Sequence, residues 1–356
     1  MPDPVTNPAT APAKVQPVKD PKTAFTPETL NESAQKYRTE LITMPMFALR
    51  MATAHMGMRT SIRYKEHVHE LAGRFQIGNF DKYKKGDGAT DIKQRTLETF
   101  LGNCIEPISP VSIYKTLWGS DQVNPSAQKN QPWTKRICAF IIAQIGEHMF
   151  DYLWTAKHDD NDTTLTMKWF NGFCAIEDVE IALGTMSAEE QNLYTLPAEG
   201  ITAENAEDVF NEFVWGSEAA NSTWRGVHKK LRDGSPKKLF MSDTAKHKYE
   251  VCYQMNHGAL PYNLGFTKGH LDGKENIEFV PLSNVPEDYL CLTSKNNILT
   301  LWNQETSDEK FEVKDSLTSH YDVDFISNLF FGTQYLSINK EMLAVARKAN
   351  TQYTAW

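Results

Sequence analysis

The stretch RFQIGNFDKYKKGDGATDIKQRTLETFL, residues 74–101, decides how the rest of the chain is interpreted. Apolar residues alternate loosely over 75–80, a turn-rich segment follows at 84–88, and β-type residues return over 92–100. This pattern predicts a long hairpin whose arms each reach about 40 Å at roughly 3.3 Å per residue. The arms carry so few apolar side chains that an isolated two-stranded ribbon of this kind is unstable in water. It therefore needs a neighbouring surface to lie on.

The predicted ribbon is also locally basic. Between residues 81 and 95 it carries five basic and three acidic side chains, an excess of two positive charges on an acidic chain. One interpretation is a solvated loop. The more specific interpretation is a basic arm that contacts an acidic surface of another copy. On that second interpretation the inter-subunit contact residues are Lys82, Lys84, Lys85, Lys93 and Arg95.

The composition excludes several broad classes of protein. Lys and Arg number 37 against 45 Asp and Glu, which gives a formal charge of -8 and disfavours generic DNA binding. No run of apolar residues is long enough to span a bilayer, and the N-terminal sequence lacks the pattern of a secretory signal. Five widely separated cysteines without a Cys-x-x-Cys pair fit a reducing cytoplasm and predict buried thiols.

The strongest helix signal begins at Pro132, which would occupy the first position of the helix, where proline is tolerated. Apolar residues then recur at spacings of three and four from Trp133 to Tyr152, which places one broad apolar stripe on a single helix. Such a helix has about 24 residues and is about 36 Å long at 1.5 Å per residue. This length is typical of the backbone of an elongated molecule.

The flanking segments predict an arm before the ribbon and an α/β portion after the long helix. Seven of the 17 prolines fall in residues 1–27, so this segment is predicted to be extended. Helices are predicted over 26–41, 203–213 and 222–230, over 245–255 with Ser242 as the cap, and from Asn339 onward. Strands are predicted over 239–241, 277–281, 289–293, 298–302, 311–314, 321–331 and 334–338.

The sequence contains no recognisable catalytic motif. It has no glycine-rich phosphate loop, no Gly-x-Ser-x-Gly elbow and no His-Glu-x-x-His pair. On a strand, His67 and His69 would share a face and could bind zinc with a distant third group, although a histidine at an edge more often makes one hydrogen bond. We therefore predict no catalytic residue, no cofactor and no metal site.

An arm, a ribbon, a long helix and an α/β portion, in this order, resemble the major capsid protein of tailed bacteriophages, the Hong Kong 97-type fold also used by encapsulin shells. Local motifs agree with the resemblance, which covers roughly residues 28–348. They are Arg95–Phe100 (RTLETF), Lys238–Ser242 before a helix, Leu292–Ile298 (LTSKNNI) and Phe331–Gln334 before a strand. These motifs are structural, and no catalytic residue is carried over from the family.

The resemblance implies an α+β fold divided into the parts of that family. Residues 1–61 would form the N-terminal arm and helix, 62–104 the extended β-hairpin loop, and 105–174 the peripheral domain with its long spine helix. Residues 175–310 would form the axial domain, and 311–356 would return to the peripheral domain.

The resemblance also implies a structural role rather than an enzymatic one. Copies of the chain would form hexamers and pentamers of an icosahedral shell around double-stranded DNA, without sequence-specific binding and without a membrane. Scaffolding, portal and decoration proteins would be partners, and the protein would be located in the virion after assembly in the host cytoplasm.

Three alternatives stay open at this point. The first is an encapsulin-like shell, which requires a cargo-binding pocket. The second is a metal-dependent enzyme that uses His67 and His69. The third is a monomeric binding module, which predicts a particle near the chain mass of 40.5 kDa.

Overall fold

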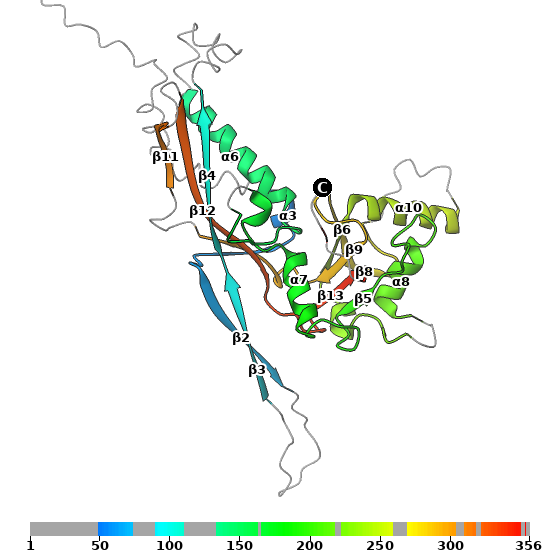
Figure 1. The fold of residues 1–356 in the computed structure, drawn as a ribbon. Coiled ribbons are helices and arrows are strands. Elements are labelled where there is room, and N and C mark those ends of the chain that lie inside the picture. Colours follow the sequence, from blue (N-terminus) through cyan, green and yellow to red (C-terminus); the bar gives the residue numbers. More distant parts are fainter. Residues whose placement is uncertain are drawn as a thin grey trace, which may run out of the picture.

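The structure, a computed structural model, has three parts: a long sheet with a helix along it, a projecting ribbon, and a second sheet covered by helices (Figure 1). The ribbon points away from the other two parts. The structure describes residues 49–73, 90–109, 133–162, 165–217, 222–258, 269–303, 310–317, 322–349 and 353. No helix within these ranges is long and apolar enough to cross a membrane.

The long sheet has five strands, of which β12 is the longest and the central one. Its order is β1-β10-β12-β11, with β4 paired to the first part of β12. Only the pairing of β1 with β10 is parallel. The strands are β1 (Gly57–Thr60), β4 (Phe100–Ile108), β10 (Ile298–Trp302), β11 (Lys310–Asp315) and β12 (Val323–Tyr335).

Helix α6 (Trp133–Asp151) lies along one face of this sheet (Figure 1). Its apolar stripe buries Ile137 and Ile142 against Phe325 and Leu329 of β12. The predicted long helix is therefore confirmed, although it has 19 residues and ends at Asp151 rather than near residue 155. Two further short helices flank this part, α3 (Arg50–Thr53) and the 3-10 helix η2 (Thr166–Lys168).

The ribbon consists of β2 (Lys65–Gly73) and β3 (Thr90–Glu98), which pair in antiparallel register from Lys65 with Glu98 to Gly73 with Thr90. The predicted returning strand of the hairpin is confirmed as β3, and its observed partner β2 lies before the predicted range 74–101. The residue types of β2, with Glu, His, Ala and Gly among them, do not mark a strand by composition. Residues 74–89, and with them the predicted first arm over 75–80 and the predicted turn, lie outside the described residues.

The second sheet has six strands in the order β5-β13-β9-β6-β8-β7. Helix α10 follows β6 with Ser242 as its cap, and the Ser242 Oγ accepts a hydrogen bond of 3.0 Å from the Ala245 N–H, as predicted. The strands are β5 (Leu193–Thr195), β6 (Lys237–Ser242), β7 (His270–Leu271), β8 (Lys274–Leu282), β9 (Tyr289–Thr293) and β13 (Leu343–Arg347). The helices are α7 (Phe173–Ala182), α8 (Ala206–Trp215), α9 (Lys229–Arg232) and α10 (Asp243–His257).

Two helix predictions in this half of the chain are wrong. The segment after Asn339 forms strand β13 rather than a helix, because every residue of Leu343–Arg347 is buried between β5 and β9. Leu and Ala favour a helix in isolation, but here the strands β5 and β9 hydrogen-bond to the backbone of this segment on both of its edges. In the predicted helix 222–230, only Lys229 and Lys230 are helical, as the start of α9 (Lys229–Arg232). Residues 1–48, with the predicted arm and first helix, lie outside the described residues.

Two strands pair in a different sheet from the one that the implied domain boundaries assign to them. Strand β10 falls within 175–310, the range implied for the axial domain, yet it pairs with β1 and β12 in the long sheet. Strand β13 falls within 311–356, the implied return to the peripheral domain, yet it pairs with β9 and β5 in the six-stranded sheet. The two sheets share one core cluster, so they are joined by packing as well as by the chain.

The predicted strand 321–331 continues through Gly332 to Tyr335 as β12, so the predicted separate strand 334–338 is wrong: only its first two residues are strand, as the end of β12. This glycine allows the base of the ribbon to approach β12, since a Cβ built at residue 332 would lie 2.3 Å from the Glu98 carbonyl oxygen.

Gly332→Ala is expected to lower the free energy of unfolding by about 2–3 kcal/mol, because backbone atoms must move to accept the methyl group. Chemical denaturation of the purified variant measures this loss. The matched control is Gly234→Ala, where no atom lies within 4 Å of the added Cβ, and it is expected to change stability by less than about 0.5 kcal/mol. Equal effects of the two substitutions would contradict the role given to Gly332.

Candidate functional site at the root of the ribbon

The base of the ribbon is anchored by a small apolar cluster on the long sheet. Leu97 of β3 is fully buried against Leu299 and Leu301 of β10, together with Ile62. Leu299 and Leu301 alternate with Ile298, Thr300 and Trp302, so they lie on the sheet face opposite the shared core. The ribbon thus joins the body through one face at its base.

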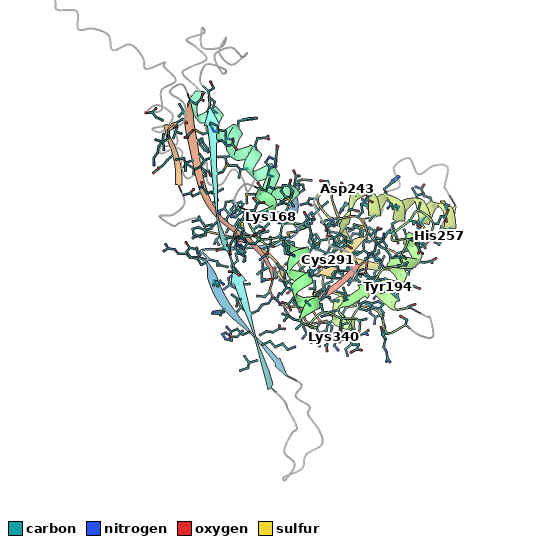
Figure 2. The ribbon with its side chains drawn as sticks, viewed as in Figure 1. Lys168, Tyr194, Asp243, His257, Cys291 and Lys340 are labelled. Atoms are coloured by element: carbon teal, nitrogen blue, oxygen red, sulfur yellow. The ribbon has the colours of Figure 1, made fainter. Side chains whose placement is uncertain are left out.

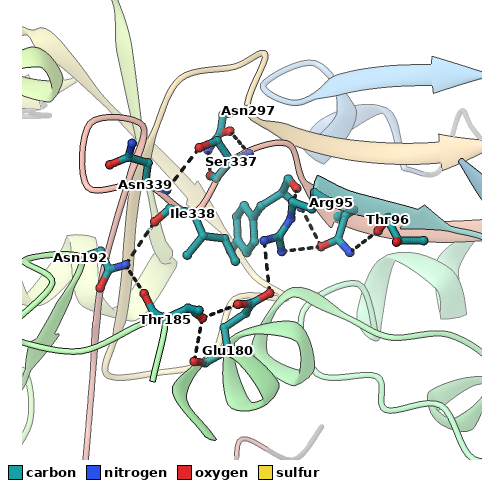
Figure 3. Close-up of polar contacts among 11 residues, drawn as sticks. Arg95, Thr96, Glu180, Thr185, Asn192, Asn297, Ser337, Ile338 and Asn339 are labelled. Atoms are coloured by element: carbon teal, nitrogen blue, oxygen red, sulfur yellow. Dashed lines mark hydrogen bonds and ion pairs between the residues drawn. The ribbon is translucent and has the colours of Figure 1, made fainter. Parts of the chain in front are cut away.

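Arg95 of β3 provides the polar part of this anchor (Figure 3). Its Nε–H donates to the Tyr335 carbonyl oxygen at 2.7 Å, and its Nη2 donates to Gln334 Oε1 at 3.2 Å. Its Nη1 lies 3.2 Å from Glu180 Oε1, and the two side chains are only 17% and 18% exposed. Burial lowers the pKa of Arg95, and Glu180 acts in the opposite direction. We call Arg95, Glu180, Gln334 and Tyr335 the root cluster.

Gln334 ties a second point of the ribbon to β12. Its Nε2 donates to the Thr96 carbonyl oxygen at 3.1 Å, while its Oε1 accepts from Arg95 and from the Tyr335 N–H. A planar amide that meets three partners has little freedom to turn. The orientation of the ribbon relative to β12 is therefore fixed by two adjacent ribbon residues and one amide.

Helix α7 contributes the acidic member of the root cluster and also reaches the six-stranded sheet. At the end of this helix, the Thr185 hydroxyl donates to the Glu180 carboxylate and to its carbonyl oxygen (Figure 3). Glu177, three residues before Glu180 in the sequence, is completely buried and accepts hydrogen bonds from the Tyr289 and Tyr335 hydroxyls. Because Tyr335 bonds Arg95 through its carbonyl and Glu177 through its hydroxyl, the two networks are continuous.

Glu177 also faces a cation from the last strand of the six-stranded sheet. Arg347 of β13 places Nη1 3.5 Å from Glu177 Oε2 and Nη2 2.6 Å from Asp178 Oδ1. Burial raises the pKa of Glu177 to about 7, although Arg347 and the two phenols favour its charged form. Burial also raises the pKa of Tyr289 and Tyr335 well above their usual values. A single helix thus connects ribbon, long sheet and six-stranded sheet through three carboxylates.

The predicted contact residues fall into three groups. Lys82, Lys84 and Lys85 lie outside the described residues. Lys93 is exposed on the ribbon, so its side chain is available to another molecule. Arg95 differs from the expectation, because its guanidinium already has three partners within its own chain.

His67 and His69 are exposed on one face of the ribbon, as their spacing predicted. His67 Nδ1 lies 3.0 Å from the Thr96 Oγ1 of the opposite strand. Among the described residues, no group of three or more His, Cys, Asp or Glu side chains could hold a metal ion. The zinc interpretation of these two histidines therefore has no third ligand in this part of the chain.

The comparisons with known proteins concern the fold. No protein-family model and no curated protein matches the sequence. One chain of the satellite phage P4 procapsid that includes the size determination (Sid) protein is similar in structure. The TM-score is 0.50 at 9% identity, over 86% of this chain and 99% of that chain.

Two further structures are similar at lower scores. The cyanophage A-1(L) capsid has a TM-score of 0.49 at 13% identity, over 87% of this chain and 94% of that one. The holo-SrpI encapsulin complex from Synechococcus elongatus PCC 7942 has a TM-score of 0.44 at 13% identity, over 86% and 90%. We base the assignment on the P4 procapsid alone, which spans nearly the whole of both chains. The mixed helix and strand architecture of this chain is the Hong Kong 97-type capsid fold.

Proposed function

We propose that this chain is the major capsid protein of a tailed bacteriophage and that many copies of it form an icosahedral head shell. The observation that carries the proposal is the two-stranded ribbon, which is anchored at its base and extends beyond the body (Figure 1). A ribbon of two strands is marginal in water unless a further surface covers one of its faces. Another copy of the same chain supplies that surface.

The side chains of the ribbon beyond its base support this assignment. Ile92 is 63% exposed, and its neighbours Lys93 and Gln94 are also exposed. Within the described ranges no third strand pairs with β2 or β3. The exposed Ile92 and the basic Lys93 together suit a contact surface with apolar and acidic groups.

The long sheet offers a second uncovered surface. On the face opposite α6, Leu101 of β4 is 43% exposed and Ile105 is 53% exposed. They are directly paired with Phe330 and Ile326 of β12, so apolar side chains stand side by side on this face. The same sheet face carries the base of the ribbon, through Leu299 and Leu301. When the ribbon of one copy lies on the uncovered sheet face of another copy, the contact is heterologous. Repeated contacts of this kind close into rings and shells when the rotation between copies permits.

A head shell of this kind also implies what the particle contains, which proteins it contacts and where it assembles. Hexamers and pentamers of the chain enclose double-stranded DNA, and the net charge of -8 keeps the packed DNA from adhering to the wall. Scaffolding, portal and decoration proteins are the expected partners, and the role is structural rather than enzymatic. The protein belongs to the virion and assembles in the host cytoplasm, and repeated weak contacts make the shell stable.

Sizing of the purified chain, followed by electron microscopy of the large species, tests the proposal. We expect closed shells, whereas a binding module remains near 40.5 kDa. Particles recovered from an infected host separate the two kinds of shell. A capsid holds nuclease-protected double-stranded DNA, and an encapsulin-like compartment holds cargo protein instead.

The double substitution His67→Ala and His69→Ala tests the enzyme alternative. Both side chains are exposed, so we expect shell yield within about twofold of the unsubstituted chain. Metal analysis before and after the substitution is the second measurement. A bound metal that disappears in the variant, together with an activity that it supports, would favour the enzyme over the capsid.

A further inference from the structure

Helix α7 ends in an exposed apolar face. Val179 is 59% exposed, and Leu183, the residue that follows the last turn of the helix, is 70% exposed. The two residues are four positions apart, and the exposed Ala182 lies three positions after Val179, so all three share one face of the helix. Among the described residues, no other helix exposes two large apolar side chains one turn apart. We call Val179, Ala182 and Leu183 the α7 face.

Two ion pairs fix the direction of the α7 face. At 3.6 residues per turn, Asp178 and Glu180 leave the helix about 100° to either side of Val179. Glu180 pairs with Arg95 of the ribbon. Asp178 pairs with Arg347 of β13, in the six-stranded sheet. The α7 face is therefore turned outward into the angle between the ribbon and the six-stranded sheet, where Figure 1 places this helix.

Charged groups surround the α7 face rather than occupy it. In residues 179–188 the only ionisable side chain is Glu180, which the root cluster already binds. Charged side chains lie at the rim, namely the exposed Glu189 and Glu190 and the half-buried Lys340. The last of these lies two positions after Ile338, which Asn192 ties to Thr185 at the end of α7 (Figure 3). An uncharged apolar centre inside a charged rim is the composition of a contact between proteins.

The described part of the ribbon does not by itself provide a stable contact. Its strands have nine residues each, so one face of this part measures about 30 Å by 10 Å, or roughly 300 Å². A standard interface buries about 800 Å² on each partner. A copy that covers the ribbon is therefore expected to cover further surface next to it.

The α7 face continues from one side of the ribbon. Arg95 and Lys93 are two positions apart on β3, so they point to the same side of the ribbon. Arg95 meets Glu180 of α7 on that side, and Glu180 directly follows Val179 in the sequence. The exposed Lys93 lies about 7 Å farther out along the strand. A copy that contacts Lys93 on this side can therefore reach the α7 face in the same contact.

We propose that the α7 face is a second contact with the copy that covers the ribbon, and that this copy lies in the angle between the ribbon and the six-stranded sheet. The inference deepens the proposed function and rests on it. Val179 and Leu183 become buried when the neighbouring copy is in place. The root cluster then has two roles, because Arg95 and Glu180 hold the ribbon and the α7 face in one orientation for the same partner.

The double substitution Val179→Gln and Leu183→Gln tests this inference. Gln is a good helix former and adds no charge beside Glu180, so the free subunit is expected to unfold at the same denaturant concentration as the unsubstituted chain. The concentration of purified chain needed for assembly is expected to rise at least about tenfold, as measured by sedimentation velocity, because two apolar side chains no longer become buried. The variant Val179→Ile with Leu183→Met keeps the face apolar, and its assembly is expected to stay within about threefold of the unsubstituted chain.

Met255→Gln is the matched control at a distant site. Met255 is 64% exposed on α10, two residues before His257, which lies at the far end of the six-stranded part from α7 (Figure 2). Its replacement removes a similar exposed apolar side chain and is expected to leave assembly unchanged. An equal loss of assembly in Met255→Gln and in the double Gln variant would overturn the inference, because the α7 face would then have no special part.

Thiol labelling of Leu183→Cys tests the burial of the α7 face directly and does not depend on the stability of the Gln variants. Four native cysteines are buried and Cys104 is half-buried, so the unsubstituted chain gives the background. A maleimide is expected to label position 183 in the free subunit and to react at least about tenfold more slowly in the shell. Equal labelling rates in both states, or normal assembly of the double Gln variant, overturns the inference alone. If the unsubstituted chain stays near 40.5 kDa, the proposed function fails with it.

Discussion

Arg95→Met is expected to leave the subunit folded but to prevent normal shell assembly. The substitution removes two hydrogen bonds and an ion pair, and it leaves the largely buried Glu180 carboxylate without its cation. Truncating one member of a largely buried pair costs about 2–4 kcal/mol. Because this cost falls on the attachment of the ribbon rather than on either sheet core, we expect the ribbon to lose its fixed orientation. Assembly yield, measured by sedimentation and electron microscopy, is expected to fall at least tenfold.

The matched control is Lys93→Met, two residues along the same strand. Lys93 is exposed, so its loss removes a charge from the ribbon without disturbing the root cluster. Proteolysis of the free subunit distinguishes the two variants, since cleavage within residues 65–98 is expected to accelerate in Arg95→Met alone. Assembly of Arg95→Met at the rate of the unsubstituted chain would show that the root cluster does not position the ribbon.

Glu177→Ala is expected to destabilise the whole subunit, by about 3–5 kcal/mol. The substitution removes the acceptor of two buried tyrosine hydroxyls and the innermost carboxylate facing Arg347. Asp178→Ala is the control on the same helix, because its side chain is 37% exposed and bonds the same arginine at the surface. Its loss is expected to cost about 1 kcal/mol. Chemical denaturation measures both variants, and equal costs would contradict the buried network.

The pH dependence of stability tests the protonation of the same group. Burial raises the pKa of Glu177 from its usual 4.5 to about 7, so the folded state holds this proton where the unfolded state has lost it. The contribution to stability is therefore complete below about pH 4.5 and is lost as the pH rises through 7. The loss is on the order of 3 kcal/mol. In Glu177→Gln this part of the pH dependence is expected to disappear, and identical slopes for the two proteins would contradict it.

Local signals made parts of the fold predictable. Tyr289–Thr293 and Ile298–Trp302 are fully buried strands whose bounds equal those predicted, because each is a short run of apolar and β-branched residues between turns. Ser242 caps its helix through a bond to a residue three positions away. By contrast, Leu343–Arg347 was predicted as helix, since its strand state depends on β5 and β9, which are distant in the sequence.

The root cluster could not be predicted for the same reason. Arg95 was assigned to a contact with another copy because it belongs to a basic segment, whereas its partners Glu180 and Tyr335 are far along the same chain. A signal for the buried network did exist. Glu177, Asp178 and Glu180 interrupt the otherwise apolar helix FCAIEDVEIA, and Arg347 ends the apolar strand LAVAR. Carboxylates buried with an apolar helix face require a cation as partner, but the sequence alone does not identify the residue that supplies it.

The central claim is that a neighbouring copy completes the ribbon, and a cryo-electron microscopy reconstruction of the assembled particle tests it most directly. We expect density for residues 65–98 of one subunit to lie across another subunit, with Ile92 and Lys93 buried in that contact. A reconstruction in which the ribbon touches only its own chain, with both side chains still in solvent, would contradict the account.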